Sequence, residues 1–448
     1  MIKFRIDMPI DQKYFNSSIL VKALICLLFV LGSARIPVSA REKEKPLANA
    51  VYRDNIHTVR FFREGWDFSL PILELGSNQR LLLKFDDLSG NVKHYAYTIT
   101  HCDFDWFPSR LILPEYMEGF VDNPINDYTM SINTTIPYVN YLLAIPNDNT
   151  KLLVSGNYLL TVFEEDKHDS PVLTRRFYVS EPSTKISGIV KKATFDAFKG
   201  PNQEVDFMVE YPGISIQDPR NDVKVVLMQN SRTDNAITNL KPLNVRNNQL
   251  SYDYTQENVF AGGNEYRNFD AKNIRVNGLG IANIEFVQPM YQVTLKTDEL
   301  RRGDYRFEND LNGRYLVKND RANDPDLESD YIFVHFSLEP PQPLPVGDIY
   351  IFGELSSWQC TSTNKMTYNP TLKLYEGAML LKQGFYDYQY VYIDKGSQKV
   401  DSSILEGSHV ETENDYQIFV YYRGFSSRYD RLIGFRTINS IKQEGLNN

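Results

Sequence analysis

The chain has 448 residues, 42% of them hydrophobic, and a formal net charge of −9 at pH 7. This length exceeds what one core usually supports and predicts about three domains. The hydrophobic content excludes general disorder. The acidic balance argues against binding to nucleic acid, because backbone recognition needs clustered Lys and Arg.

Residues 1–40 have the order of a secretory signal peptide: basic residues, then an apolar run at Ala23–Gly32, then small residues at the end of Pro37–Ala40. The apolar run is too short to span a bilayer. Cys26 follows Ile25, where a lipoprotein signal requires a small residue. We therefore expect a soluble, exported protein without a lipid anchor.

Beyond residue 40, short runs rich in Val, Thr, Tyr and Phe recur between turn residues. In Val205–Tyr211 apolar and polar residues alternate, which is typical of a strand with one buried face. The pattern predicts an all-β protein built from tandem immunoglobulin-like β-sandwich domains. The expected strands are Leu81–Phe85, Tyr95–Thr100, Tyr158–Phe163, Arg175–Val179, Val205–Tyr211, Val223–Gln229, Ile281–Val287, Tyr291–Leu295, Tyr331–Leu338, Ile349–Phe352, Tyr386–Ile393 and Tyr416–Tyr422.

Two segments are candidate domain boundaries. Ser180–Ser183 follows a predicted strand and contains Pro182, and Glu339–Val346 contains four prolines, which favour an extended spacer. After the signal segment 1–40, these boundaries predict an N-terminal sandwich at 41–180, a middle sandwich at 181–340 and a C-terminal domain at 341–448.

The expected C-terminal domain has a recognisable order of elements. The strand Asp348–Gly353 is followed by Trp358, a hairpin at Tyr368–Leu381 and the aromatic strand Gly384–Val391. This order resembles the early-set immunoglobulin-like modules appended to starch- and glycogen-active proteins. Trp358 then either packs the first turn of the domain or stacks on a sugar.

Cys102 and Cys360 are the two cysteines that follow the signal segment. They fall in different expected domains, so an intradomain disulfide is excluded and an interdomain one is the alternative to two buried thiols.

Three residue groups contain side chains of the kinds that act in catalysis. The triplet His101–Asp103 lies at the end of the expected strand Tyr95–Thr100, where neighbouring side chains point to opposite faces and cannot form a relay alone. Asp86–Asp87 precedes a turn, which Asp commonly caps. Asp103 and Asp105 beside Trp106 would suit a glycosidase only if they faced a cleft, whereas a solvated face is the ordinary alternative.

Three further motifs suggest ligand binding only weakly. The segment Asp324–Asp330 alternates acidic residues but lacks the glycine of a calcium loop, which leaves calcium binding or a solvated loop as alternatives. Gly278–Gly280 and Gly262–Gly263 lack the remaining residues of a nucleotide or phosphate loop. We therefore predict no catalytic, cofactor-binding or metal-binding residue and expect a protein that is not an enzyme.

Three loop stretches rich in aromatic residues and Arg are typical of protein interfaces, although loop packing explains them equally well. They are Trp106–Tyr116, Asn264–Asp270 and Tyr421–Asp430.

Eight segments, in order along the chain, resemble the plug proteins of the type IX secretion system of Bacteroidota. They are Leu81–Leu88 (LLLKFDDL), Tyr95–Trp106 (YAYTITHCDFDW), Glu115–Phe120 (EYMEGF), Asp127–Thr134 (DYTMSINT), Ser155–Leu160 (SGNYLL), Asn264–Asp270 (NEYRNFD), Glu413–Tyr416 (ENDY) and Tyr429–Gly434 (YDRLIG).

The resemblance implies a non-enzymatic periplasmic protein that docks on the large outer-membrane β-barrel translocon and occludes its periplasmic opening. The partner is then the translocon, through which the protein is peripheral to the outer membrane. No cofactor is implied, and the free chain is expected to be a monomer. A carbohydrate-binding periplasmic or surface protein that uses the C-terminal domain is the alternative. The sequence does not indicate which surface docks or what triggers release.

Overall fold

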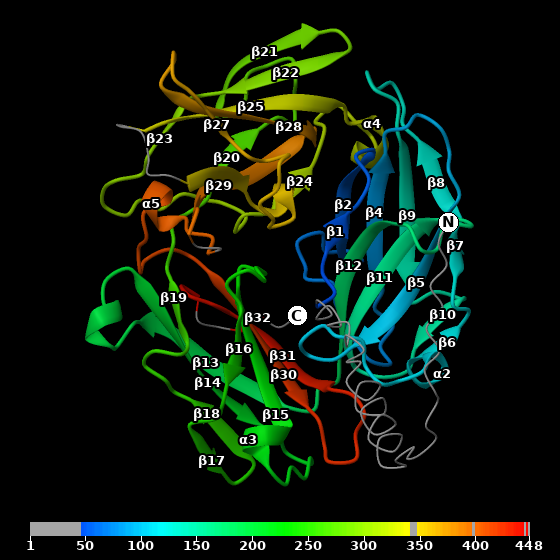
Figure 1. Cartoon of the computed structure of the whole chain (residues 1–448), viewed down its shortest axis with the longest axis vertical. Helices are drawn as coiled ribbons and strands as arrows, with labels where there is room; N and C mark the ends of the chain where they lie inside the picture. The colour runs from blue at the N-terminus through cyan, green and yellow to red at the C-terminus, as the bar shows by residue number, and fades with distance from the viewer. Residues whose placement is uncertain (1–45, 341–346, 397–398, 443–444, 447–448) are drawn as a thin grey trace, which may run out of the picture. The chain divides into compact units, whose positions relative to one another are not determined.

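The computed structural model describes residues 46–340, 347–396, 399–442 and 445–446 (Figure 1). The predicted signal segment 1–40 and most of the proline-rich segment lie outside these residues. The described part of the chain belongs to one compact unit that begins at Pro46. Strands dominate it, and its four α-helices have four residues each, so the predicted all-β class is confirmed.

The first sandwich uses residues 50–180, drawn in blue to green in Figure 1. In β9 (Val139–Ile145) Val139, Tyr141, Leu143 and Ile145 are buried and alternate with more exposed residues, as the period of a half-buried strand requires. One sheet has the order β1-β12-β11-β5-β7, with β3 beside β12, and the facing sheet has the order β2-β4-β9-β8. The bounds are β1 (Ala50–Val51), β2 (Ile56–Arg63), β3 (Ile72–Glu74), β4 (Leu81–Asp87), β5 (Tyr95–Cys102), α2 (Leu113–Tyr116), β6 (Met117–Gly119), β7 (Asn123–Ile125), β8 (Asp127–Met130), β10 (Thr150–Leu152), β11 (Gly156–Glu164) and β12 (Pro171–Ser180).

The second sandwich combines residues 185–261 with residues 415–446. Its first sheet has the order β13-β14-β18-β17, with β19 beside β14, and its second has the order β16-β15-β30-β31-β32. The bounds are β13 (Lys185–Lys192), η1 (Asp196–Phe198), β14 (Asn202–Glu210), α3 (Pro219–Asp222), β15 (Val223–Gln229), β16 (Ile237–Leu240), β17 (Asn244–Arg246), β18 (Gln249–Tyr252), β19 (Val259–Ala261), β30 (Asp415–Tyr422), β31 (Arg431–Asn439) and β32 (Gly445–Leu446).

The third sandwich uses residues 267–406, which lie between the two parts of the second. One sheet centres on β29, which pairs with β20, β24 and β26, and the other has the order β21-β22-β25-β28-β27, with β23 beside β25. The bounds are β20 (Arg267–Asp270), β21 (Ile281–Val287), β22 (Met290–Leu295), β23 (Asp298–Glu299), β24 (Tyr315–Val317), α4 (Pro325–Glu328), β25 (Tyr331–Glu339), β26 (Gly347–Phe352), η2 (Glu354–Ser356), β27 (Thr367–Asn369), β28 (Leu374–Lys382), β29 (Gly384–Asp394) and α5 (Ser403–Glu406).

This arrangement differs from the expected boundary at residues 340–341. β15 pairs along its whole length with β30, so the two sides of that boundary share one sheet. The proline-rich segment instead connects β25 to β26, which belong to the two facing sheets of the third sandwich. Proline cannot donate a ladder hydrogen bond, so a proline-rich sequence is compatible with a connection between two sheets of one domain as well as with a linker between domains, and composition alone does not separate the two.

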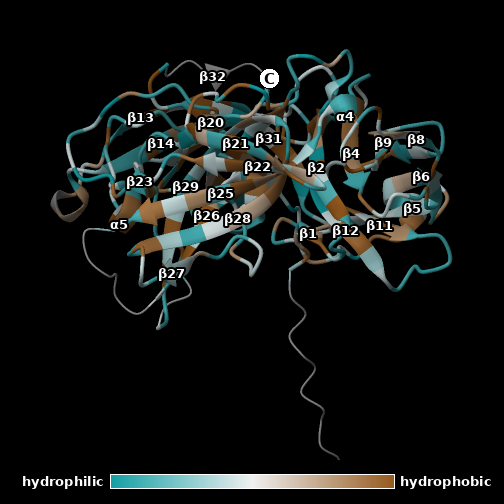
Figure 2. Ribbon diagram, turned by 90° about the horizontal axis from the view of Figure 1, so that it is seen from above, coloured by the Kyte–Doolittle hydropathy of each residue, from teal (hydrophilic) through white to brown (hydrophobic). Residues whose placement is uncertain are grey.

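Each sandwich has its own core of aliphatic and aromatic side chains. Figure 2 shows hydrophobic stretches along the strands and hydrophilic residues along many of the loops. Complete burial of a side chain such as Leu83 or Phe85 contributes about 1.5–3 kcal/mol. A fourth cluster, discussed below, lies between the first and second sandwiches.

Candidate docking surface and domain junctions

A buried ion pair joins the first and third sandwiches. Lys382 Nζ on β28 lies 2.6 Å from Asp86 Oδ2 on β4, and the two side chains are 0% and 1% exposed. The Tyr331 hydroxyl donates to the same Asp86 oxygen at 2.7 Å, and Lys382 Nζ lies 4.1 Å from the centre of the Tyr138 ring. Burial lowers the pKa of Lys382, against the opposing effect of Asp86. Asp86 thus belongs to a junction between sandwiches as well as to the end of its strand.

The acidic segment Asp324–Asp330 lies at the same junction. Asp326 accepts a hydrogen bond from Lys84 Nζ at 2.6 Å and pairs with Arg60, both from the first sandwich. Burial raises the pKa of Asp326, but Arg60 and Lys84 outweigh this effect and lower it to about 2. The Asp330 carboxylate accepts from the backbone N–H of Thr135 at 2.6 Å. Asp326 and Asp330 therefore bind cationic side chains and backbone donors of the first sandwich, whereas Asp324 is exposed.

An aromatic cluster joins the first and second sandwiches. Trp106 is 9% exposed and packs against Tyr178, with the Arg176 guanidinium 4.2 Å from its ring centre. The Tyr178 and Phe419 rings are 4.6 Å apart. The Tyr421 hydroxyl on β30 donates to Asn157 at 2.7 Å. The Trp106 end of one expected interface loop and the Tyr421 end of another are thus internal packing.

The triplet His101–Asp103 borders this cluster. Burial lowers the pKa of His101 to about 4, and its ring nitrogens contact Ser109 Oγ at 2.8 Å and the Ser155 carbonyl at 3.2 Å. Burial raises the pKa of Cys102 to about 12, so the thiol is protonated at neutral pH. Asp103 pairs with Arg423 of the second sandwich. The geometry is structural and provides no thiolate nucleophile.

The remaining sequence candidates are also accounted for. Asp105 is exposed, whereas Asp103 is committed to Arg423, so the two acids do not act together. Cys102 and Cys360 are free thiols, which excludes the interdomain disulfide. Gly278–Gly280 forms a tight turn before β21, where a Cβ at Gly278 would lie 2.1 Å from the Asp270 carbonyl oxygen.

The stretch Asn264–Asp270 lies at the junction of the second and third sandwiches. Arg267, 7% exposed, pairs with Glu406 at 2.9 Å and with Asp298 at 2.8 Å. Glu265 is 2% exposed, and burial raises its pKa to about 7. This stretch is internal packing and not an external interface.

Trp358 follows η2 and is part of the packing of the third sandwich. Its ring meets Phe352 at 5.5 Å and Tyr266 at 6.1 Å, both edge to face. Gly313 has φ +80°, and a Cβ there would lie 2.4 Å from the indole. Packing thus holds the indole against three neighbours, which is the first of the two predicted roles.

The hairpin between β30 and β31 carries an exposed apolar tip. Phe425 is fully exposed (102%) and Ile112 is 65% exposed. The ion pair between Arg428 and Glu115 holds the hairpin beside the turn that carries Ile112. Exposed aromatic and aliphatic side chains rimmed by charges are typical of a protein interface, so this tip is a candidate docking surface.

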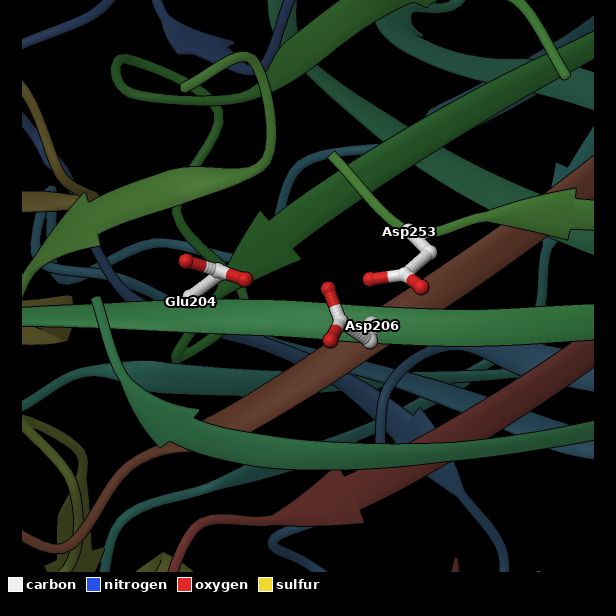
Figure 3. Close-up of side chains that lie close together, drawn as sticks. All are labelled: Glu204, Asp206 and Asp253. Carbon is white, nitrogen blue, oxygen red and sulfur yellow. The ribbon is translucent and has the colours of Figure 1, made fainter. Parts of the chain in front are cut away.

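One group of acids has the spacing of a cation site: Glu204, Asp206 and Asp253 offer oxygens within 4.8 Å of one another (Figure 3). Lys191 Nζ already lies 3.1 Å from Glu204 and 2.5 Å from Asp206. Thr194 donates its backbone N–H to Glu204 at 2.6 Å, and Asn258 donates to Asp206 at 3.0 Å. The Lys191 ammonium group therefore occupies the place that a metal cation would take beside Glu204 and Asp206.

A hollow of about 460 Å³ lies between the first and second sandwiches. Its lining includes Arg63, Glu74, Glu181, Lys185 and Arg436. Glu181 pairs with Arg431 and accepts from Ser155, so this acid also serves the junction.

Within the described residues, no helix is long and apolar enough to cross a membrane. The features above define a class: an all-β protein of three sandwiches joined by buried ion pairs and aromatic packing, with exposed apolar side chains suited to binding another protein.

Comparison with known proteins identifies the family. Residues 56–181 match the first domain of the type 9 secretion system plug protein. The crystal structure of a hypothetical protein from Parabacteroides merdae is 39% identical, covers 88% of this chain and 100% of its own, and superimposes with a TM-score of 0.86. No curated protein matched the chain. The chain belongs to the type 9 secretion system plug protein family.

Proposed function

We propose that this protein is a non-enzymatic periplasmic plug that docks on the outer-membrane translocon of the type IX secretion system and occludes its periplasmic opening. The observation that carries the proposal is the match of residues 56–181 to the plug family. The proposed partner is the translocon barrel, and the free chain is proposed to be a monomer.

The geometry supports docking more than chemistry. Two carboxylates that were candidates for catalysis pair with cations at the junctions, Asp86 with Lys382 and Asp103 with Arg423. The fully buried pair of Asp86 and Lys382 resists relative movement of the sandwiches, because separating it would leave a buried charge without a partner. A rigid body of this kind can seal an opening without turnover of a substrate.

The carbohydrate-binding alternative depended on Trp358 and on a separate C-terminal domain. The indole packs against Phe352 and Tyr266, and the residues of that expected domain are divided between two sandwiches. No observation therefore favours the alternative.

Deletion of the gene tests the proposal. We expect secretion to continue while the outer membrane becomes permeable to a large fluorescent dextran, and the reintroduced gene to restore the barrier. Unchanged permeability in the deletion strain would contradict occlusion. Binding of the purified mature chain to the purified translocon barrel checks docking separately.

A further inference from the structure

Among the described residues, one long strand at a sheet edge is left uncovered. β21 ends the order β21-β22-β25-β28-β27 and lies at the top of Figure 1. Five of its seven residues are exposed, including Phe286 at 54% and Val287 at 51%. The loop before it adds Val276 at 64% and Leu279 at 62%. Asn277 donates to the Ala282 carbonyl at 2.8 Å, which leaves Asn283–Val287 as the open part of the edge.

Two other long edge strands of the described sheets are covered. β2 meets the third sandwich, where Thr58 Oγ1 lies 2.6 Å from the Tyr331 hydroxyl and Arg60 pairs with Asp326. β13 carries three lysines, and Arg436 donates to its Ile186 carbonyl at 2.8 Å. Proteins usually protect edge strands by such covering or by charge, because unpaired backbone groups recruit further strands. Among the described residues, Asn283–Val287 of β21 has no such covering, and its charge is limited to the single residue Glu285.

We propose that the edge of β21 is a site for strand addition by an extended segment of the translocon. This inference rests on the proposed function and adds a second docking surface to the hairpin tip between β30 and β31. Unpaired backbone N–H and C=O groups select an extended chain, and the exposed side chains Phe286 and Val287 select apolar residues in it.

The charge of β21 indicates whether the added strand comes from a second copy of this chain or from a different protein. Glu285 is the only ionisable residue of β21 and is exposed. A second copy would bring another Glu285 on a chain of net charge −9, and like charges on adjacent strands are destabilising. The segment that fits therefore carries a Lys or Arg opposite Glu285, flanked by apolar residues.

The test uses the full mature chain and the purified translocon barrel in detergent. Val287→Lys and Glu285→Lys each place a cation on the edge, and we expect each to weaken binding about tenfold or more. Ile189→Lys is the matched control, because Ile189 is 47% exposed on β13 in another sandwich, and its affinity should equal that of wild type. Thermal unfolding of each variant verifies that it folds.

Hydrogen exchange of the wild-type complex provides a second measurement that needs no variant. Strand addition should slow exchange of backbone amides within Asn283–Val287 when the barrel is bound. If the barrel binds but exchange there is unchanged and both lysine variants bind normally, the inference is wrong and the proposed function stands. If wild type does not bind the barrel, both fail. Loss of a wild-type dimer in Glu285→Lys would show that the edge pairs with a second copy and would overturn the assigned partner.

Discussion

The two junctions made by the first sandwich differ at their centres, although ion pairs of partly exposed side chains, such as Asp103 with Arg423, also cross the junction with the second sandwich. Toward the third sandwich it presents charges, with Lys382 and Asp86 paired in full burial and Asp326 between Arg60 and Lys84. Toward the second it presents aromatic and aliphatic side chains around Trp106, Tyr178 and Phe419. Apolar packing tolerates small changes in shape, whereas a buried ion pair requires its partner in place. The charged junction therefore specifies one position of the third sandwich relative to the first. The aromatic junction stabilises the contact between the first and second sandwiches through apolar burial.

Replacement of the buried lysine should have the largest effect. Lys382→Met keeps most of the side-chain volume but leaves Asp86 buried without its cation, and we expect a loss of about 3–5 kcal/mol in the free energy of unfolding. Urea denaturation measures it. Lys365→Met is the control, because its pair with Asp348 is 43% and 37% exposed and should contribute below about 1 kcal/mol. Equal losses in the two variants would show that burial adds nothing to the pair between Lys382 and Asp86.

The aromatic junction should lose stability in mildly acidic solution through His101. Burial lowers its folded pKa to about 4 from the ordinary value of 6.5, so the unfolded chain binds a proton first as the pH falls. The contribution of neutral His101 to the free energy of unfolding is complete above about pH 6.5. It declines by roughly 3 kcal/mol as the pH falls toward about 4. Denaturation of wild type and His101→Gln across this window measures the difference. His94→Gln, at an exposed position, should retain the wild-type profile.

The charged junction should respond in a more acidic window. The folded pKa of Asp326 is lowered to about 2 from the ordinary value of 3.8, so its contribution is present above the unfolded pKa and is lost as the pH falls through the folded one. This contribution of Asp326 to the free energy of unfolding is about 2 kcal/mol. In Asp326→Asn, the fall in unfolding free energy between about pH 5 and about pH 2 should shrink by this amount. An unchanged slope would show that Arg60 and Lys84 do not act through Asp326.

A conservative change in the aromatic junction should have the smallest effect. Phe419→Leu keeps an apolar side chain at a fully buried position, and we expect a loss below about 1.5 kcal/mol by urea denaturation. Phe419→Asp is the opposite control, because a carboxylate without a partner cannot be accommodated there. A larger loss for Phe419→Leu than for Lys382→Met would reverse the roles assigned to the two junctions.

Local patterns determined most of the strands. The alternation in Val205–Tyr211 and the mostly apolar run Val223–Gln229 both predicted strands, and they correspond to β14 and β15. Strand formation depends on side chains two residues apart, which a single sequence displays. The family resemblance was visible in the same way, from short segments in a fixed order.

Partner strands and exposure were decided only by the tertiary structure. Nothing in Val223–Gln229 states that it pairs with Asp415–Tyr422, because a ladder hydrogen bond between backbones carries no residue identity. For the same reason the apolar strand Ile281–Val287 gave no sign of being an uncovered edge, and Asp326 no sign of meeting Arg60. The chain thus specified its elements through local periodicity, while long-range pairing and burial assembled them into nested sandwiches, charged junctions and a free edge.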